Sequence, residues 1–246
     1  VFNQRSNNYK NVFDSSTGFM RGRFADGSWR VPFNPYESNH RRDDYCEGNA
    51  WQWTFFVPHD TKGLAKLMGG DKKLQARLDS LFTANSDISG ENKSGDISGL
   101  IGQYAHGNEP SHHVAYLYDY IGKPSQTQFY VREIMDKLYK NTPDGICGND
   151  DTGQMSAWYV WSAMGFYPVR HGTGEYMVGT PLFKHLELFH QKGKLIINAP
   201  QVSSVNRYIR SIRLNGKKLN RYYLLHNELF SGNAVLEFEM TNNPQK

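Results

Sequence analysis

Two segments of this 246-residue sequence place carboxylates directly ahead of aromatic-rich helical patterns. Glu47 stands before Trp51 and Trp53, whose rings could exclude water and raise its pKa, as a general acid requires. Asp150 and Asp151 lie between glycines before another such pattern, where the helix dipole and backbone N–H groups favour ionised carboxylates that can activate water. One acid and one base facing each other across a site are what glycoside hydrolysis requires.

Both segments also have simpler interpretations. Glu47 would be a first-turn carboxylate favoured by the helix dipole. Asp151 or Thr152 would be the N-cap of the helix that follows. The capping role does not compete with catalysis, because one carboxylate can do both.

A third polar segment, in the middle of the chain, combines histidines with oxygen donors next to a proline. The Asn108 carbonyl and Glu109 are the hard oxygen ligands that Ca²⁺ prefers. A zinc hydrolase site built from His106, His112 and His113 is a second interpretation, but the sequence has no HExxH motif and no cysteine pair to complete a tetrahedral site. A third is a polar turn whose histidines hydrogen-bond backbone groups. Calcium fits better than zinc.

The elements that must hold these groups are mainly helices. Residues 1–40 are rich in glycine, proline and asparagine, which predicts a helix remnant followed by long loops lining a site. Between residues 48 and 167 the apolar spacing predicts helices that glycine or proline ends. The expected helices cover 50–57, 61–68, a stretch capped by Asp71 with Leu74, Leu78, Leu81 and Phe82 on one face, 111–121, 124–139 and 152–166.

After about residue 179 the period changes to two, which predicts strands. The expected strands are 186–188, 194–197, 209–214 and 234–240, with a hairpin at 214–217. The chain is therefore predicted to be mainly α with a small antiparallel β-domain at its C-terminal end.

The composition is globular and rich in aromatic residues. Five Trp, 15 Tyr and 14 Phe make 14% of the chain, and such rings suit sugar faces as well as cores. Lys and Arg exceed Asp and Glu by only 4, so we expect no nucleic-acid partner. The apolar runs are too short to span a membrane. The sequence leaves open whether Cys46 and Cys147 form a disulfide. We expect no signal peptide in the first residues of this sequence.

Several long motifs occur together in a fixed order. They are EGNAWQ from Glu47, VPHD from Val57, LMGG from Leu67, GQYAHGNEPSHH from Gly102 and GNDDTGQMSAWY from Gly148. Together they resemble glycoside hydrolase family 92, the calcium-dependent exo-α-mannosidases of Bacteroides-type bacteria.

The resemblance implies an architecture. Family members join an N-terminal β-sandwich to a catalytic (α/α)6 barrel, so we expect 1–180 to be the C-terminal part of that barrel. Residues 181–246 would then be a small β-strand domain, and the β-sandwich would be absent from this chain. The missing domain is the expected partner within the same protein.

The resemblance also implies residue roles. Glu47 is expected to be the general acid and Asp151 the general base, with Asp150 beside it. Calcium would be held by the Asn108 carbonyl and Glu109, with Gln52 as a further ligand, and would contact O2 and O3 of the sugar. The expected substrate-binding residues are Asn49, Trp51, His106, His112 and Asn149.

The implied activity is inverting hydrolysis of terminal α-linked mannose in mannose-rich glycans, in the periplasm, outside the cell or on its surface. Tyr104 and Ala105 stand where a His-Glu pair is expected in α-1,2-cleaving members, so α-1,2 and α-1,3 linkages both stay open. The alternative is a fragment that binds mannose without cleaving it.

Overall fold

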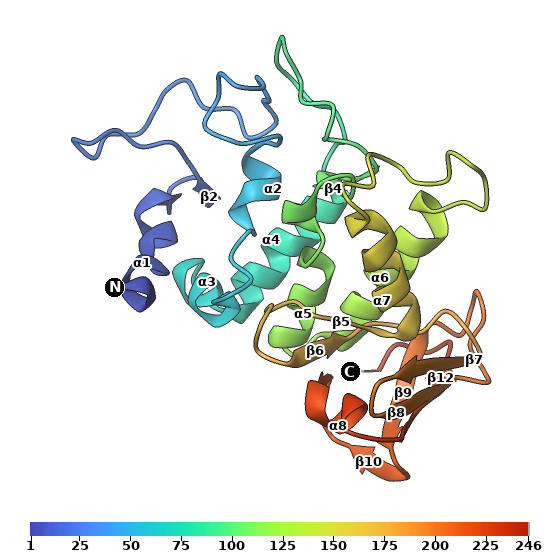
Figure 1. Cartoon of the computed structure of the whole chain (residues 1–246). Helices are drawn as coiled ribbons and strands as arrows, with labels where there is room; N and C mark the ends of the chain where they lie inside the picture. Colours follow the sequence, from blue (N-terminus) through green and yellow to red (C-terminus); the bar gives the residue numbers. More distant parts are fainter. Residues whose placement is uncertain (246) are drawn as a thin grey trace. The chain divides into compact units, whose positions relative to one another are not determined.

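The computed structural model describes residues 1–245, which form two compact units. The first unit comprises residues 1–114 and 146–149, and the second comprises 115–145 and 150–246. The predicted boundary near residue 180 falls inside the second unit. Figure 1 follows the chain through both units.

The first unit consists of short helices, two small hairpins and long loops (Figure 1). Most of residues 21–49 lies outside regular elements, as the glycine- and proline-rich sequence predicts. The elements are α1 (Phe2–Arg5), η1 (Asn8–Val12), β1 (Phe13–Asp14), β2 (Phe19–Met20), α2 (Ala50–Thr54), α3 (Thr61–Leu67), α4 (Asp71–Thr83), β3 (Leu100–Ile101), β4 (Tyr104–Ala105) and η2 (Glu109–Ser111).

Helices α3 and α4 confirm their predicted ranges closely. The Asp60 side chain caps α3 by accepting a hydrogen bond from the Gly63 N–H at 2.9 Å. Asp71, which was predicted to cap α4, is instead its first helical residue, and Gly70 is the N-cap. The face of α4 that was expected to be apolar is the buried one: Leu74, Leu78, Leu81 and Phe82.

Two helix predictions are wrong in extent. Helix α2 ends at Thr54 rather than at residue 57, because the Phe55 carbonyl turns to accept a hydrogen bond from His113. The predicted helix 111–121 is divided into η2, η3 (Val114–Tyr116) and α5 (Leu117–Tyr120). The apolar spacing in this stretch reflects nearly complete burial of every side chain from 111 to 118 rather than one helical face.

The second unit pairs long helices with two sheets. Helix α6 (Pro124–Leu138) agrees with its predicted range, and α7 (Gln154–Met164) begins two residues later than predicted. The remaining elements are α8 (His226–Phe230), β5 (Phe166–Tyr167), β6 (Glu175–Val178), β7 (His185–His190), β8 (Gly193–Asn198), β9 (Tyr208–Leu214), β10 (Lys217–Leu219), β11 (Tyr223–Leu225) and β12 (Ala234–Thr241).

The larger sheet has five strands in the order β10-β9-β12-β8-β7. The four predicted strands are all present in it, and Asn215 and Gly216 form the predicted hairpin turn with φ angles of 50° and 76°. The prediction of an antiparallel domain is confirmed except at one pairing, because β12 pairs with β8 in parallel. A parallel pairing needs a long crossover connection, and the stretch between β8 and β12, which includes β9, β10 and α8, supplies it.

One side of this sheet closes the main core of the second unit. Leu195, Ile197, Ile212, Leu236 and Phe238 are all at most 3% exposed within that core. Figure 1 shows α8 beside the sheet, where it contacts β8 and β12. A second sheet, β11-β6-β5, was not predicted, because its strands are only two to four residues long. No helix within residues 1–245 is long and apolar enough to cross a membrane.

Candidate active site

The predicted general acid occupies a strained turn in the first unit. Glu47 has a φ angle of 52°, in the left-handed region that residues with a Cβ atom rarely adopt. Holding a non-glycine residue there costs about 1–3 kcal/mol, and such residues persist only where the surroundings fix them. The Glu47 side chain is half-buried.

Two side chains fix this turn through its carbonyl oxygens. The Trp53 indole Nε1 donates to the Cys46 carbonyl at 2.7 Å. The Asn108 Nδ2 donates to the Glu47 carbonyl at 3.0 Å and lies 3.5 Å from the Glu47 carboxylate Oε2. Since the neighbouring carbonyls are both bound, the backbone at Glu47 has little freedom to relax.

A capping box joins the turn to α2. The Asn49 side chain accepts a hydrogen bond from the Trp51 N–H at 3.0 Å, and the Gln52 Oε1 accepts one from the Asn49 N–H at 2.7 Å. The Gln52 Nε2 donates to the Gln103 carbonyl at 2.7 Å, and Asn49 Nδ2 donates to Gln103 Oε1 at 3.1 Å. Asn49 is completely buried, so this predicted sugar ligand supports the turn in the structure.

Trp51 is also enclosed by protein. Its ring is 6% exposed and meets Phe19 edge-on at 4.8 Å and Tyr36 at 5.8 Å. The guanidinium of Arg77 lies 5.6 Å from the ring centroid. Of the two tryptophans expected to face Glu47, Trp53 is the one that contacts its turn.

The histidines of the central motif are buried, and each has a ring nitrogen bonded within the protein. His106 Nδ1 shares a 2.8 Å hydrogen bond with the Tyr104 hydroxyl, and His112 Nε2 lies 2.9 Å from the His106 carbonyl. Burial lowers the pKa of His106 well below its usual range, and His112 adds to that effect. Burial lowers the pKa of His112 to about 4, although its bond to the His106 carbonyl opposes the shift. His113 Nε2 is bonded to the Phe55 carbonyl at 2.8 Å.

These contacts do not favour the zinc interpretation. Within residues 1–245 no group of three or more His, Cys, Asp and Glu side chains is arranged to hold a metal ion. One ring nitrogen of each histidine is already used inside the protein. The polar-turn interpretation of His112 and His113 describes the bonds that they make.

The predicted calcium ligands fit calcium in chemical kind. Glu109 supplies a half-buried carboxylate. The Asn108 backbone carbonyl accepts from the Ser111 N–H at 3.1 Å, which leaves a second lone pair. Asn108 Oδ1 accepts from the Glu109 N–H at 3.1 Å, and Gln52 Oε1 is bonded within the capping box. All are hard oxygen donors, and Ca²⁺ completes its six to eight ligands with water or substrate oxygens.

The base segment belongs to the second unit. Asp151, Thr152 and Gly153 have φ angles of 45°, 62° and 90°, three successive left-handed residues ahead of α7. The prediction that Asp151 or Thr152 caps α7 is wrong, since the N-cap is Gly153, which has no side chain. Left-handed backbone at two residues with a Cβ atom is again strain that the surroundings must hold.

Asp150 supplies part of that hold. Its Oδ1 accepts a hydrogen bond from the Ser156 N–H at 2.9 Å, and its Oδ2 accepts from the Ser156 hydroxyl at 2.9 Å. This predicted catalytic carboxylate therefore anchors the turn to the first turn of α7. Helix α7 is positioned by Tyr139, which stacks on the buried Trp158 at 6.0 Å and donates to the Met155 carbonyl at 2.9 Å. Asn149 is the last residue of the first unit and is exposed.

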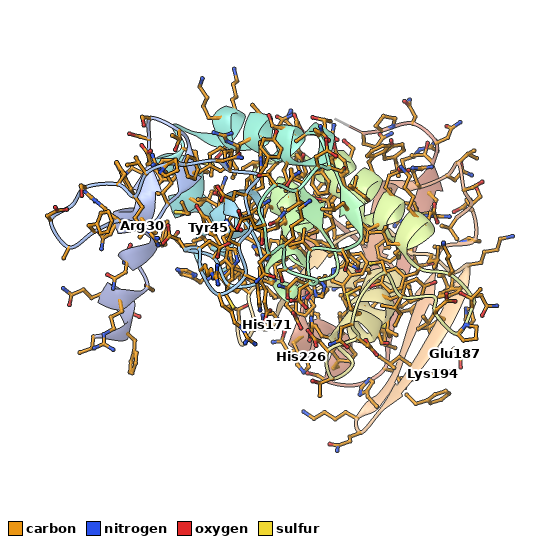
Figure 2. The ribbon with its side chains drawn as sticks, turned by 90° about the horizontal axis from the view of Figure 1, so that it is seen from above. Arg30, Tyr45, His171, Glu187, Lys194 and His226 are labelled. Carbon is orange, nitrogen blue, oxygen red and sulfur yellow. The ribbon has the colours of Figure 1, made fainter. Side chains whose placement is uncertain are left out.

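A groove of about 770 Å³ lies beside the acid turn in the first unit. Cys46 and Trp53 belong both to its wall and to the turn, and Figure 2 shows Arg30 and Tyr45, which also line it. Phe24 and Phe56 contribute apolar surface that is 55% and 42% exposed. Cys46 and Cys147 are both free thiols.

Sequence reasoning missed the central role of Gln103. Its side chain is fully buried and joins Asn49 to the carbonyls of Asn85 and Asp87, which it reaches from Nε2 at 2.5 and 3.1 Å. A glutamine among glycine and tyrosine gives no periodic signal. Its place in the long motif from Gly102 was the available hint, and only the fold shows that it joins the start of α2 to the loop before β3.

The family model for the glycosyl hydrolase family 92 catalytic domain matches residues 1–242. The chain belongs to glycosyl hydrolase family 92. This confirms the resemblance inferred from the motifs.

Solved structures of family 92 resemble this chain over most of its length. The α-mannosidase BT3965 from Bacteroides thetaiotaomicron, solved in complex with mannoimidazole, is 38% identical with a TM-score of 0.88 over 96% of this chain and 32% of its own. The inverting mannosidase BT2199 from the same organism is 40% identical, with a TM-score of 0.83 over 98% of this chain and 33% of its own.

A curated relative from Arthroderma benhamiae, an uncharacterized secreted glycosidase, is 29% identical over 96% of this chain. The match covers 31% of that protein. The family 92 chain described here thus spans about a third of the length of the relatives that it matches.

Proposed function

We propose that this chain carries the catalytic carboxylates of an inverting exo-α-mannosidase. Glu47 protonates the glycosidic oxygen, and Asp151 removes a proton from the water that attacks the anomeric carbon from the opposite face. The observation that carries the assignment is backbone strain: both carboxylates lie in left-handed turns immediately before helices. Residues with a strained backbone conformation are concentrated at functional sites, where the direction of the side chain must be fixed.

Other residues have supporting roles in this proposal. Asp150 holds the turn of Asp151 through Ser156. Asn49 and Gln52 hold the turn of Glu47 through the capping box. The exposed Asn149 is the predicted sugar ligand that is best placed to reach a substrate from its own unit.

Calcium is part of the proposal. The Glu109 carboxylate and the Asn108 carbonyl would hold it, and a bound Ca²⁺ would supply a positive charge for sugar hydroxyls. These oxygen donors, and not the buried histidines, are the chemistry that fits it.

The decisive experiment uses the protein as its gene encodes it. Glu47→Gln should lower turnover of an α-linked mannobiose by a factor of roughly 10²–10⁴, the usual contribution of a general acid. NMR of the first product formed should show inverted anomeric configuration, because an inverting site places water opposite the leaving group. Retained configuration would refute the proposed role of Asp151 as the base that activates water.

The substrate and setting are proposals of the same kind. We propose terminal α-1,2- or α-1,3-linked mannose in mannose-rich glycans, and action outside the cytoplasm. The name of the secreted fungal relative supports the second point. We also propose that the chain is the C-terminal part of an (α/α)6 barrel completed by an N-terminal β-sandwich. The match to only a third of each relative is consistent with a part of a longer protein.

Because the chain spans only a third of its relatives, residues 1–246 on their own have a second candidate function. That candidate is mannose binding without hydrolysis. Calorimetric titration of residues 1–246 with mannose, beside an activity assay on the same preparation, separates the two. Binding without turnover would support the second candidate.

A further inference from the structure

The turn that carries Glu47 depends on an indole from the helix that follows it. Trp53 lies near the end of α2, yet its Nε1 reaches back seven residues to the Cys46 carbonyl at 2.7 Å. That carbonyl belongs to the peptide group leading into Glu47. The hydrogen bond therefore holds the peptide group on the N-terminal side of Glu47, whose φ is a left-handed 52°.

The same ring also covers the residue after Glu47. A Cβ atom added to Gly48 would lie 2.9 Å from Trp53 Nε1 and 3.0 Å from its Cδ1. Glycine at this position is what lets the indole approach the backbone so closely. Phe56 holds the other side of the ring in an edge-on contact at 5.2 Å. Trp53 thus touches both neighbours of Glu47 in the chain.

We propose that Trp53 is a positioning residue for the general acid, acting through the Cys46 carbonyl and not by contact with the sugar. This inference rests on the proposed role of Glu47. The indole N–H fixes the peptide plane from which the Glu47 side chain projects, and the ring blocks the relaxed backbone that the turn would otherwise take. A small displacement of a catalytic group is enough to cost about a hundredfold in rate.

The experiment uses the dependence of hydrolysis on the leaving group. A general acid matters when the departing group is a sugar hydroxyl and matters little when it is an acidic phenol that leaves unprotonated. Trp53→Phe keeps an aromatic ring beside Phe56 but removes the N–H donor. In the protein as its gene encodes it, kcat for an α-linked mannobiose should fall roughly tenfold to a hundredfold. For 2,4-dinitrophenyl α-mannoside kcat should change less than about threefold, with KM unchanged for both substrates.

Two further variants complete the test. Gly48→Ala should give the same selective loss, because the new methyl displaces the indole from the Cys46 carbonyl while Trp53 itself is kept. Trp29→Phe is the matched control: this ring packs against Arg21 and Arg23 in the same unit and makes no contact with the turn.

The outcomes separate this inference from the proposed function. If Glu47→Gln shows the selective loss and neither Trp53→Phe nor Gly48→Ala does, the positioning role is wrong and the acid assignment stands. If the two variants lose activity equally on both substrates, the ring has a structural role only. If Glu47→Gln hydrolyses mannobiose normally, the proposed acid is wrong, and the inference falls with it.

Discussion

Asn108 links the acid turn to the proposed calcium ligands. Its Nδ2 donates to the Glu47 carbonyl at 3.0 Å, while its Oδ1 accepts from the Glu109 N–H at 3.1 Å. Both bonds use one amide group: the Nδ2 bond joins the two segments, and the Oδ1 bond to the adjacent residue fixes the orientation of the side chain. Glu47 and Asn108, which are 61 positions apart in the sequence, are thereby in direct contact.

Asn108→Asp tests this link without changing the size of the side chain. The aspartate retains the oxygen that caps Glu109 but loses the donor and places a second carboxylate near Glu47. We expect kcat/KM on mannobiose to fall by about a hundredfold, because a misplaced acid loses its geometry. Asn108→Ser, which retains a small donor and acceptor, should lose less. Unchanged activity in Asn108→Asp would show that the link is dispensable.

Gln103→Ala should destabilise the protein. The change leaves the buried Asn49 amide and the Asn85 carbonyl without their partner, at about 1–3 kcal/mol for each unsatisfied group. Urea unfolding followed by circular dichroism measures the loss. Gln4→Ala, on the exposed helix α1, is the control and should shift stability by less than about 0.5 kcal/mol. A difference between the variants of under 1 kcal/mol would contradict the role of Gln103.

Removal of calcium should abolish hydrolysis reversibly. Dialysis against a chelator takes away the charge that Glu109 and the Asn108 carbonyl are proposed to hold, and added Ca²⁺ should restore the rate. Zn²⁺ should not restore it, because the histidines are buried with ring nitrogens bonded to protein. Full activity after chelation, verified by elemental analysis, would exclude a calcium role.

Acid should weaken the first unit through Asp14. Burial alone would raise the pKa of this carboxyl, but hydrogen bonds from Ser16, Arg21 and Thr17 outweigh burial and hold the pKa well below its usual range. A lowered folded-state pKa gives stability that is present above about pH 4 and lost as pH falls further. Asp14→Asn breaks a 2.6 Å pair with a buried Arg21 and should cost about 3–5 kcal/mol at neutral pH. The variant should also lose part of the acid sensitivity in thermal melts between pH 5 and pH 2.

Asp119 should act in the opposite direction in the second unit. Burial raises the pKa of its carboxyl well above the usual range, although the polar side chain of Thr127 opposes the shift. The folded state therefore keeps a proton that the unfolded chain releases above about pH 4, and stability falls as pH rises from there. Asp119→Asn should raise the melting temperature at pH 7 by a few degrees. The exposed Asp144→Asn should have no effect, and a lower melting temperature for Asp119→Asn would contradict the expectation.

The sequence predicted the features that follow from local pattern. The apolar face of α4 and the four long strands appear where their periodicity places them. The C-terminal end of α2 and the division of residues 111–121 into shorter helices were not predicted. Both depend on burial and on hydrogen bonds to residues distant in the sequence. The parallel pairing of β12 with β8 was missed for the same reason, since period-two alternation does not encode strand direction.

The candidate site was predictable in residue type but not in arrangement. Glu47, Asp150 and Asp151 were found from charge beside aromatic helices. Residue type alone did not distinguish Asp150 from Asp151, and the family resemblance is what made Asp151 the expected base. The fold adds that Asp150 bonds Ser156 and that Asp151 occupies a left-handed position. The role of Asp151 as the base stays a proposal.

The two units are interleaved along the chain, which crosses between them after residues 114, 145 and 149. Neither unit is a continuous stretch of sequence, so a single cut that keeps one unit whole also keeps a segment of the other. The last crossing falls between Asn149 and Asp150, one residue before the proposed base. A linker inserted at this junction would lengthen the chain between the segments that carry the proposed acid and the proposed base, while leaving Glu47 and Asp151 chemically unaltered.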